Sequence, residues 1–491
     1  MNRREFLGAA VGASVAMSGV ERVVGRISSF AAPPAAGSVL NAPAGDCPVD
    51  TVVVVMMENR SFDHYLGWLG GDAAYLESGR RLYGANFGIN GRVDQQFVAP
   101  DGRKVRTHEA DAAGFDKFES RGCTFRDPGH GWAAARSQRD HGFLAPGSGN
   151  DEYALSYYVE KDMPIYSALA RRFTVFDRWH SSLLGPTFPN RQYLLSAQSE
   201  GRKGNTGGMV AGVFQADTIV DRLGKAGVPV GYYYTNVPLL ALWGVERMAP
   251  YIRSLDRYWD DAASGKLPQV TFVEPQFGGG DNIRTDDHPR GDVGMGQRWI
   301  REVFGAFARS PHWQRGAFVV VYDEGGGFFD HVRPPVLRDN RASPQDQQNF
   351  GQAGFRVPAL LASPYAAPGA VDHRLYDHTS IMRFLEWRYL GAPPEGSGGA
   401  RKWALTLRDG HANNMGATLR ASGANPDLGF DLQVTIPQPS PPCTPSQHST
   451  RPVQTVDEDP FDRADLQDLA VTEFPRPTHK PWFDDVTVSL Q

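Results

Sequence analysis

Two stretches of the chain consist almost entirely of β-branched and other apolar residues, and each stops abruptly at polar side chains. They cover residues 51–57 and 317–322. A continuous apolar run of this length predicts a strand that is buried on both faces, as in a parallel sheet. In open α/β sheets, ligands bind beyond the carboxyl ends of the strands. The residues that follow the two runs are therefore candidates for chemistry: Glu58 and Asn59 after the first, Asp323 and Glu324 after the second.

Further strands and helices alternate along the chain. Short apolar runs predict strands at residues 174–180, 228–234, 269–273 and 357–363. Apolar spacing and capping residues predict helices at residues 162–173 and 217–227, after residue 289 and after residue 378, with a short helix starting near Ser61. This alternation predicts the α/β class, with a mostly parallel central sheet and helices on both faces.

One hydroxyl group stands in a conformationally restricted stretch. Gly185, Pro186 and Pro189 surround Thr187 and favour a stiff turn, which precedes a helix-like segment at residues 192–196. We therefore expect Thr187 to be held rigidly.

The ends of the chain differ in composition from its centre. Residues 1–31 contain Arg3-Arg4 followed by an apolar run of small residues, which resembles a bacterial twin-arginine export signal cleaved near Ala31. The apolar run is too short to anchor the protein in a membrane. The other predicted regions are a Pro/Ala/Gly linker at 32–46, a folded domain at 47–430 with a loop-rich, lid-like region at 70–150, and a Pro-rich, acidic extension at 431–491.

Charge and cysteine content narrow the classes of function. The net charge of −5 gives no reason to expect a nucleic acid as partner. The three cysteines, Cys47, Cys123 and Cys443, lack the spacing of a metal site. In an oxidising compartment one disulfide is possible, and the sequence leaves its partners open.

If the strand ends meet, oxygen ligands gather there without a thiolate. Such a set suits one divalent cation, Mg²⁺, Ca²⁺ or Mn²⁺, with Zn²⁺ as an alternative. A cation would allow several carboxylates to share a small space and would activate Thr187 as a nucleophile. Arg60 or Arg191 would hold phosphoryl oxygens, and three loop histidines would do the same or transfer protons: His130, His288 and His331.

Each of these residues also has a purely structural explanation. The acidic residues suit a helix cap or a solvated loop, and His130 suits a local turn. We expect His64 to pack on its helix and His378 to belong to a helix cap.

Four motifs together are similar to those of the phosphoesterase family. That family includes bacterial phospholipases C of the non-zinc type, plant non-specific phospholipases C and an acid phosphatase. The similarity runs in order from about Cys47 to Leu390, with Gly326 at a place where a more variable residue is expected. The motifs are residues 58–64, 185–191, 286–289 and 322–331.

The resemblance implies an alkaline-phosphatase-like α/β sandwich with one metal ion. The implied metal ligands are Glu58, Asn59, Thr187, Asp323 and Glu324. Thr187 would also be the nucleophile and form a phospho-enzyme that water hydrolyses. The histidines that would contact the phosphoryl group or act as acid and base are His130, His288 and His331.

The leading hypothesis is therefore an exported phospholipase C that cleaves glycerophospholipids into diacylglycerol and a phosphorylated head group. The alternatives are a phosphomonoesterase of the acid-phosphatase type, a sulfatase-like or other phosphodiester enzyme, and an exported binding protein without catalysis. Expected partners are phospholipids or small phosphate esters, with transient contact to a membrane surface. Membrane lysis is not expected, because the long carboxyl-terminal extensions of haemolytic relatives have no counterpart here. Head group, metal identity, oligomeric state and the final location, whether periplasm, envelope or medium, stay open.

Overall fold

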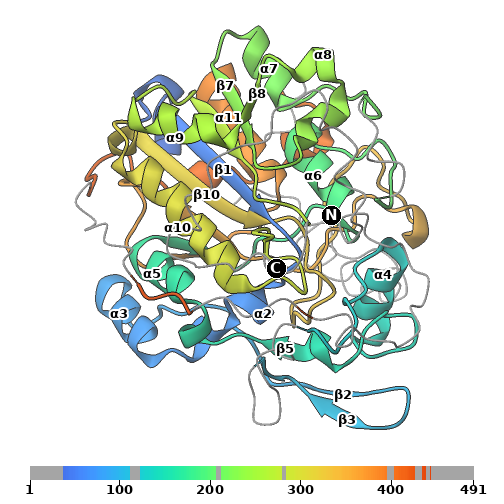
Figure 1. The fold of residues 1–491 in the computed structure, drawn as a ribbon. Helices are drawn as coiled ribbons and strands as arrows, with labels where there is room; N and C mark the ends of the chain where they lie inside the picture. Colours follow the sequence, from blue (N-terminus) through green and yellow to red (C-terminus); the bar gives the residue numbers. More distant parts are fainter. Residues whose placement is uncertain are drawn as a thin grey trace, which may run out of the picture.

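The computed structural model describes residues 37–110, 122–205, 212–278, 283–394, 403–425, 434–437 and 443 (Figure 1). The proposed export signal and most of the carboxyl-terminal extension lie outside the described residues. Within the described part of the chain, no helix has both the length and the apolar character needed to cross a membrane.

An eight-stranded sheet forms the centre of the molecule, in the order β12-β6-β11-β10-β1-β9-β7-β8. Strand β1 lies between β10 and β9 and is parallel to both, whereas β11 is antiparallel to its two neighbours. The mostly parallel sheet predicted from the sequence is thus confirmed. The strands are β1 (Thr51–Met57), β6 (Thr174–Phe176), β7 (Val230–Tyr234), β8 (Ile252–Ser254), β9 (Val270–Val273), β10 (Gly316–Tyr322), β11 (Ala359–Ala362) and β12 (Val371–Asp372).

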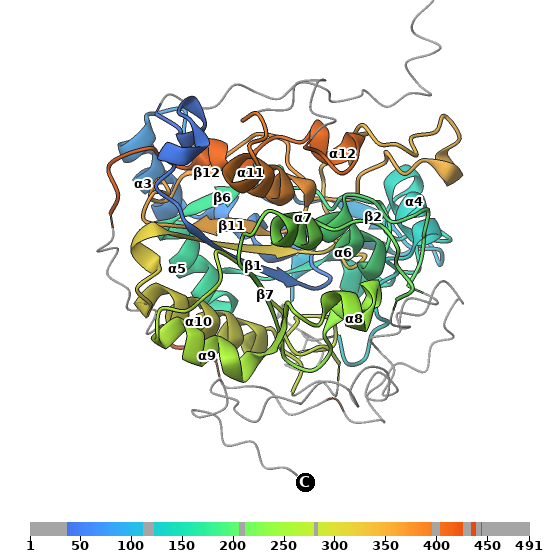
Figure 2. The ribbon, with the colours of Figure 1, turned by 90° about the horizontal axis from the view of Figure 1, so that it is seen from above.

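Helices cover both faces of this sheet, as predicted. Figure 2 shows α7 and α11 on one side and α5, α9 and α10 on the other. In α10, the helix predicted after residue 289, the apolar stripe of Ile300, Val303, Phe304 and Phe307 is buried, and the side chain of Asp292 caps the first turn. The larger helices are α5 (Pro164–Arg172), α6 (Thr187–Ser196), α7 (Ile219–Lys225), α9 (Leu255–Ala263), α10 (Val293–Arg309) and α11 (Thr379–Leu390).

Residues 70–150 contain more regular structure than predicted. Helix α3 (Ala73–Tyr83) buries only Tyr75 and Gly79, so its sequence shows little apolar periodicity. The other elements of this region are the hairpin strands β2 (Gln96–Val98) and β3 (Lys104–Arg106), β4 (His108–Glu109) and α4 (Trp132–His141). Elsewhere lie β5 (Ser156–Tyr157), α2 (Phe62–Tyr65), α8 (Val245–Met248) and α12 (Leu407–Gly410).

Short 3-10 turns complete the described secondary structure. They are Val39–Asn41, Ala44–Asp46, Gly67–Gly71, Glu152–Leu155, Glu160–Asp162, Leu239–Trp243, Trp313–Arg315, Asp346–Gln348 and Met415–Thr418.

The predicted linker and extension both contain residues that pack on the domain. Val39 and Leu40 are buried, and the backbone of Ser38 pairs with Arg420, so residues 37–46 are part of the fold. At the other end Ile436 is buried, and Arg298 donates hydrogen bonds to its carbonyl group. The Pro- and Ala-rich composition concealed these apolar contacts, and the linker prediction is wrong for residues 37–46.

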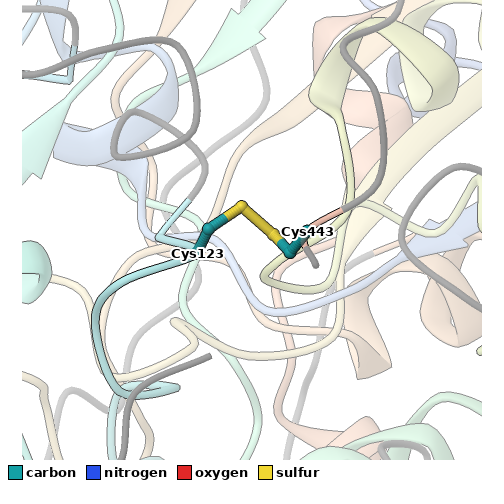
Figure 3. Close-up of a disulfide and its surroundings, with 2 residues drawn as sticks. All are labelled: Cys123 and Cys443. Atoms are coloured by element: carbon teal, nitrogen blue, oxygen red, sulfur yellow. A yellow bond between two sulfur atoms is a disulfide. The ribbon is translucent and has the colours of Figure 1, made fainter. Parts of the chain in front are cut away.

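A disulfide links two distant parts of the chain. Cys123 and Cys443 are bonded across 320 residues, as Figure 3 shows, while Cys47 is buried and reduced. The bond fastens the extension to the segment that precedes His130. The sequence left this pairing open because neither spacing nor count distinguishes the three possible pairs.

Candidate active site

The parallel pairing of β1 and β10 brings the two polar strand ends together. Met57 lies opposite Tyr322, so the residues that follow both strands emerge at the same level. The backbone N–H of Asn59 donates to Asp323 Oδ1 at 3.0 Å, and that of Arg60 donates to the Glu324 carbonyl at 3.1 Å. Glu58, Asn59 and Asp323 have no exposed surface and Glu324 has 3%. The predicted meeting of the strand ends is confirmed.

Asn59, two residues after the end of β1, has a left-handed conformation, with φ at 58°. The side chain of Asn59 accepts a hydrogen bond from Thr187 Oγ1 at a long 3.4 Å. This contact joins the stretch around Thr187 to the two strand ends. Non-glycine residues in this conformation carry strain and gather at functional sites.

Thr187 is the first residue of α6 rather than part of a turn that ends before residue 192. Pro186 supplies the extended backbone that precedes a helix, and Pro189 is tolerated because the first helical turn needs no N–H partner there. Asn190 fastens this turn by donating to the carbonyl groups of Gly185 and Pro186 at 2.9 and 3.0 Å. The predicted rigidity of Thr187 is thus accompanied by a helix amino terminus, which favours negative charge.

Arg191, a predicted phosphoryl ligand, is instead engaged by buried carboxylates. Its guanidinium group donates to Glu58 Oε1 at 2.9 Å and lies 3.4 Å from Glu274 Oε1 and 3.5 Å from Asp323 Oδ2. It also donates to the carbonyl groups that end β1. Burial raises the pKa of Glu274 to about 7, with Arg191 opposing the rise. We call Glu58, Arg191, Glu274 and Asp323 the pocket network.

The pocket network contains more acids than bases, which bears on metal binding. One arginine faces three carboxylates, and Glu324 lies beside them. Uncompensated buried charge is costly, so a surplus of carboxylates suits a bound cation. The oxygen donors of Glu58, Asn59, Thr187, Asp323 and Glu324 match the preferences of a hard divalent ion. The residues therefore fit the predicted metal.

Arg60, the other predicted phosphoryl ligand, serves the fold. It is fully buried, donates to the Asp287 carbonyl at 2.7 Å, and lies 2.9 Å from His64 Nε2. Its guanidinium group stacks over Phe328, with 5.0 Å to the ring centroid. Burial and the charge of Arg60 hold the pKa of His64 well below its usual value, so His64 stays neutral. His64 is thus a buried structural residue that is held by Arg60 and Phe328, which lie outside the helix α2.

His130 and His288 form a cluster with Asp127. One ligand atom of each residue lies within 4.8 Å of the others. Carbonyl oxygens only accept, so Nδ1 of each ring carries the proton that it donates, from His130 to Pro128 at 2.8 Å and from His288 to Pro289 at 2.6 Å. In a neutral ring Nε2 is then the basic nitrogen. His288 Nε2 lies 4.0 Å from Asp127 Oδ2.

Backbone contacts attach this cluster to the strand ends. The N–H of Glu58 donates to the Asp286 carbonyl at 2.8 Å, which places the segment before His288 against the end of β1. Gly326 has φ at 61°, and a Cβ there would collide with the carbonyl oxygen of Asn59. A Cβ on Gly327 would lie 2.6 Å from the carbonyl oxygen of Gly129, next to His130. Glycine at these positions is required by close approach.

His331, predicted to contact the phosphoryl group, lies in a different cluster. Its Nδ1 is 2.7 Å from Asp63 Oδ2 and its Nε2 is 3.1 Å from Asn90 Oδ1. Arg356 joins Asp63 at 2.8 Å and Asp330 at 2.9 Å. Among the described residues His331 makes no contact with Thr187 or the other two predicted histidines. We call Asp63, Asp330, His331 and Arg356 the Arg356 network.

Two further residues support the site in ways that the sequence did not predict. His378 is the N-cap residue of α11, as expected, and Asp377 Oδ1 accepts a hydrogen bond from the first N–H of that helix. In addition, His378 Nε2 donates to the Asp323 carbonyl at 2.7 Å, and burial lowers the pKa of His378 to about 4. Asp287 accepts hydrogen bonds from Tyr65 and Tyr322, and burial raises its pKa to about 7. Neither role has a local signal, because each depends on strands distant in sequence.

Comparison with known proteins identifies relatives of the whole region that contains the site. The phosphoesterase family model matches residues 49–390. Non-specific phospholipase C6 of Arabidopsis thaliana is 33% identical over 367 residues, which cover 68% of this chain and 66% of that protein. Phospholipase C B of Mycobacterium tuberculosis is 27% identical over 515 residues and covers 91% of both. Non-hemolytic phospholipase C of Pseudomonas aeruginosa is 27% identical and covers 80% of this chain and 62% of its own length.

Two solved structures show a weak similarity of fold to this chain. The lipoteichoic acid synthase LtaP from Listeria monocytogenes has a TM-score of 0.35 and 8% identity, covering 74% of this chain and 76% of its own. A protein in the alkaline phosphatase superfamily from Vibrio parahaemolyticus has a TM-score of 0.28 and 11% identity, covering 57% and 72%.

Proposed function

The chain belongs to the phosphoesterase family, and on that premise we propose that it is an exported, metal-dependent phospholipase C. It hydrolyses phosphoester bonds, as the family and the phospholipases C among its relatives do. The proposed substrate is a glycerophospholipid, which is split into diacylglycerol and a phosphorylated head group. The observation that carries the proposal is the hydroxyl of Thr187 at the start of α6, next to Asn59 and the carboxylate-rich pocket network.

The proposed metal ligands are Glu58, Asn59, Thr187, Asp323 and Glu324. A divalent cation bound there supplies positive charge that stabilises the alkoxide form of Thr187. The oxygen-rich ligand set favours Mg²⁺, Ca²⁺ or Mn²⁺ over Zn²⁺. His378 positions Asp323 through its backbone carbonyl, and Arg191 positions Glu58 through its carboxylate.

In the proposed reaction, Thr187 Oγ1 attacks phosphorus and the bond from phosphorus to the glycerol oxygen breaks. The positive end of the α6 dipole, at Thr187, favours the developing negative charge. Nε2 of His130 or His288, when protonated, gives its proton to the leaving glycerol oxygen. Water then attacks phosphorus, the bond from phosphorus to Thr187 Oγ1 breaks and returns the alkoxide, and the same nitrogen accepts the proton of that water. His331 has no part in these steps, since Asp63 and Asn90 engage both of its ring nitrogens.

A phosphomonoesterase with the same nucleophile is the second candidate. Both candidates would use Thr187 and the same set of proposed metal ligands. Rates on phosphatidylcholine and on a soluble phosphate monoester separate the two candidates.

Thr187→Ala tests the proposed chemistry. We expect it to reduce hydrolysis of phosphatidylcholine at least about a thousandfold, because it removes the nucleophile. Thr187→Ser should retain measurable activity, and acid-quenched wild-type enzyme should yield a phosphopeptide that contains residue 187. Unchanged hydrolysis by folded Thr187→Ala, or a phosphoryl group on another residue, would show that the nucleophile is assigned wrongly.

Export by the twin-arginine route is a separate part of the proposal. It is supported by the Arg3-Arg4 pair and the small-residue apolar run that follows. Replacing both arginines with lysine should trap the precursor inside the cell, as fractionation would show. Export of this variant at the wild-type rate would contradict the assigned route.

A further inference from the structure

The exposed apolar side chains lie in one stretch of the sequence, and one of them stands on a hairpin that projects from the domain. Among the described residues, the large hydrophobic side chains that are exposed are Leu82, Tyr83, Val93 and Val98, at 59, 43, 40 and 60% of their surface. Leu82 and Tyr83 end α3, whereas Val98 lies on hairpin β2–β3, which extends from the lower edge of the molecule in Figure 1, away from α3. We propose that this hairpin edge, residues 96–106, docks onto an anionic phospholipid bilayer.

Charge complementarity identifies the bilayer as the occupant. Residues 96–106 contain three basic residues, Arg103, Lys104 and Arg106, and one aspartate, in a chain whose net charge is −5. Arg103 is paired with Asp101, whereas within the described part of the chain Lys104 and Arg106 form no ion pair. The charges of Arg103 and Asp101 cancel, so Lys104 and Arg106 give the edge a surplus of positive charge. Basic residues beside exposed apolar ones are typical of surfaces that bind anionic lipids.

The hairpin has one face for the protein and one that the protein leaves open. Phe97 and Val105 pack against a small apolar cluster of the domain. Their neighbours along the strands point the other way, and Val98, Lys104 and Arg106 are exposed. The inner face therefore holds the hairpin in place while the outer face presents a valine between basic side chains.

The inner face also connects the edge to the proposed active site. The ring of Phe97 lies 5.2 Å from that of Phe329, in the loop that begins with Asp323 and Glu324. Arg103 lies 3.5 Å from Glu152, and the backbone of Ala154 accepts a hydrogen bond from Phe329. A bilayer bound at the outer face would thus be separated only by the hairpin from the loop that supplies two metal ligands. This inference rests on the proposed lipid substrate.

Vesicle binding tests the proposal. Protein carrying Thr187→Ala, which leaves the lipid intact, would be sedimented with vesicles of phosphatidylcholine alone or mixed with phosphatidylglycerol. We expect tighter binding to the mixed vesicles and weaker binding at high salt. Lys104→Gln and Arg106→Gln should each weaken it about fivefold. Val98→Asp should weaken it about tenfold.

Lys225→Glu is the matched control, since Lys225 is exposed on α7 at the opposite side of Figure 1. It should bind vesicles like the parent protein. When the same hairpin substitutions are made in protein that retains Thr187, the variants should keep the wild-type rate on a soluble, monomeric phosphodiester. That rate also shows that they fold. Absence of binding to mixed vesicles, or equal loss with Lys225→Glu, would overturn the docking edge. So would a change in oligomeric state in place of vesicle binding.

The same assays separate failure of the docking edge from failure of the proposed function. If the soluble phosphodiester is hydrolysed but the hairpin variants bind vesicles normally, only the docking edge is wrong. If no phosphodiester is hydrolysed while the hairpin variants lose vesicle binding, the edge stands and the proposed activity is wrong.

Discussion

Two buried ionic networks lie side by side in sequence but differ in their charge balance. The pocket network sets Arg191 against three carboxylates, from Glu58, Glu274 and Asp323. The Arg356 network sets one arginine and a histidine against two carboxylates, from Asp63 and Asp330. Both draw acids from the segments that follow β1 and β10, and the pocket network adds Glu274, which follows β9. Acidic residues close together on the same loops therefore belong to networks of different charge balance.

The difference shows how the ratio of buried carboxylates to basic side chains distinguishes a site that can bind a cation from one that stabilises the fold. In the Arg356 network each carboxylate has a cationic partner within 2.9 Å, which suits a clamp that closes a loop over α2. In the pocket network the acids outnumber the base, which leaves a place for a cation from outside the chain. The substitutions below probe this contrast, beginning with the largest expected effect.

The first substitution is Asp323→Asn, compared with Asp330→Asn seven positions later on the same loop. We expect Asp323→Asn to lose the bound metal and at least about a thousandfold in activity, because a charged ligand becomes neutral. Asp330→Asn should keep one metal per chain. Elemental analysis of both purified proteins, with phosphodiester turnover, measures the difference. Equal metal content in the two variants would show that the pocket network does not bind the metal more specifically than the Arg356 network.

The second substitution is Arg356→Met, which leaves two buried carboxylates without their guanidinium partner. We expect the free energy of unfolding to fall by about 3–5 kcal/mol, the usual cost of breaking a buried ion pair. Urea denaturation followed by circular dichroism measures it. Arg374→Met, at an arginine with a more distant acidic partner, is the control and should cost far less. A loss below about 1 kcal/mol for Arg356→Met would mean that the network is not a clamp.

The third test concerns Asp287, a buried acid that faces two tyrosine hydroxyls. Its pKa is raised from 3.8 to about 7, so between these values the folded protein holds a proton that the unfolded chain releases. The favourable contribution of Asp287 to the free energy of unfolding is therefore present below pH 4 and is lost as the pH rises to about 7. Relative to Asp287→Asn, the wild type should lose at most about 1.4 kcal/mol per pH unit in this window. A constant difference between the denaturation curves at pH 5, 6 and 7 would contradict the assignment.

The smallest expected effect belongs to His331→Asn. His331 lies at the margin of its network, with 17% of its side chain exposed. We expect the free energy of unfolding to change by about 1 kcal/mol or less, and turnover to stay within a few-fold of wild type. His288→Asn should lose at least about a hundredfold in the same assay, since His288 lies at the site. If both variants lost activity equally, His331 would belong to the catalytic groups after all.

The sequence predicted the strand ends and Thr187 because the signals are local. Apolar runs predicted β1 and β10, and parallel pairing then required Glu58 and Asp323 to meet. The helix start at Thr187 was missed because Pro189 reads as a helix breaker, although it is tolerated in the first turn.

The roles of the arginines and of His331 were not predictable from the sequence. Arg191 and His331 stand in motifs rich in polar residues, and only the tertiary structure shows that carboxylates engage them. The partners lie far apart along the chain: Arg191 binds Glu58, and His331 binds Asp63. Residue type alone does not distinguish a side chain that faces a substrate from one that neutralises a neighbour.

The central position of β1 has a consequence for synthesis of the protein. Val52 pairs with Val270 on one side and Ala317 on the other, so both neighbours are made long after it. At about 5–20 residues per second, ~200 further residues take ~10–40 s to emerge from the ribosome. Throughout that interval an apolar strand has two unpaired edges, which is the condition for aggregation between nascent chains. We therefore expect chaperones to protect the strand that supplies Glu58 and Asn59 during synthesis.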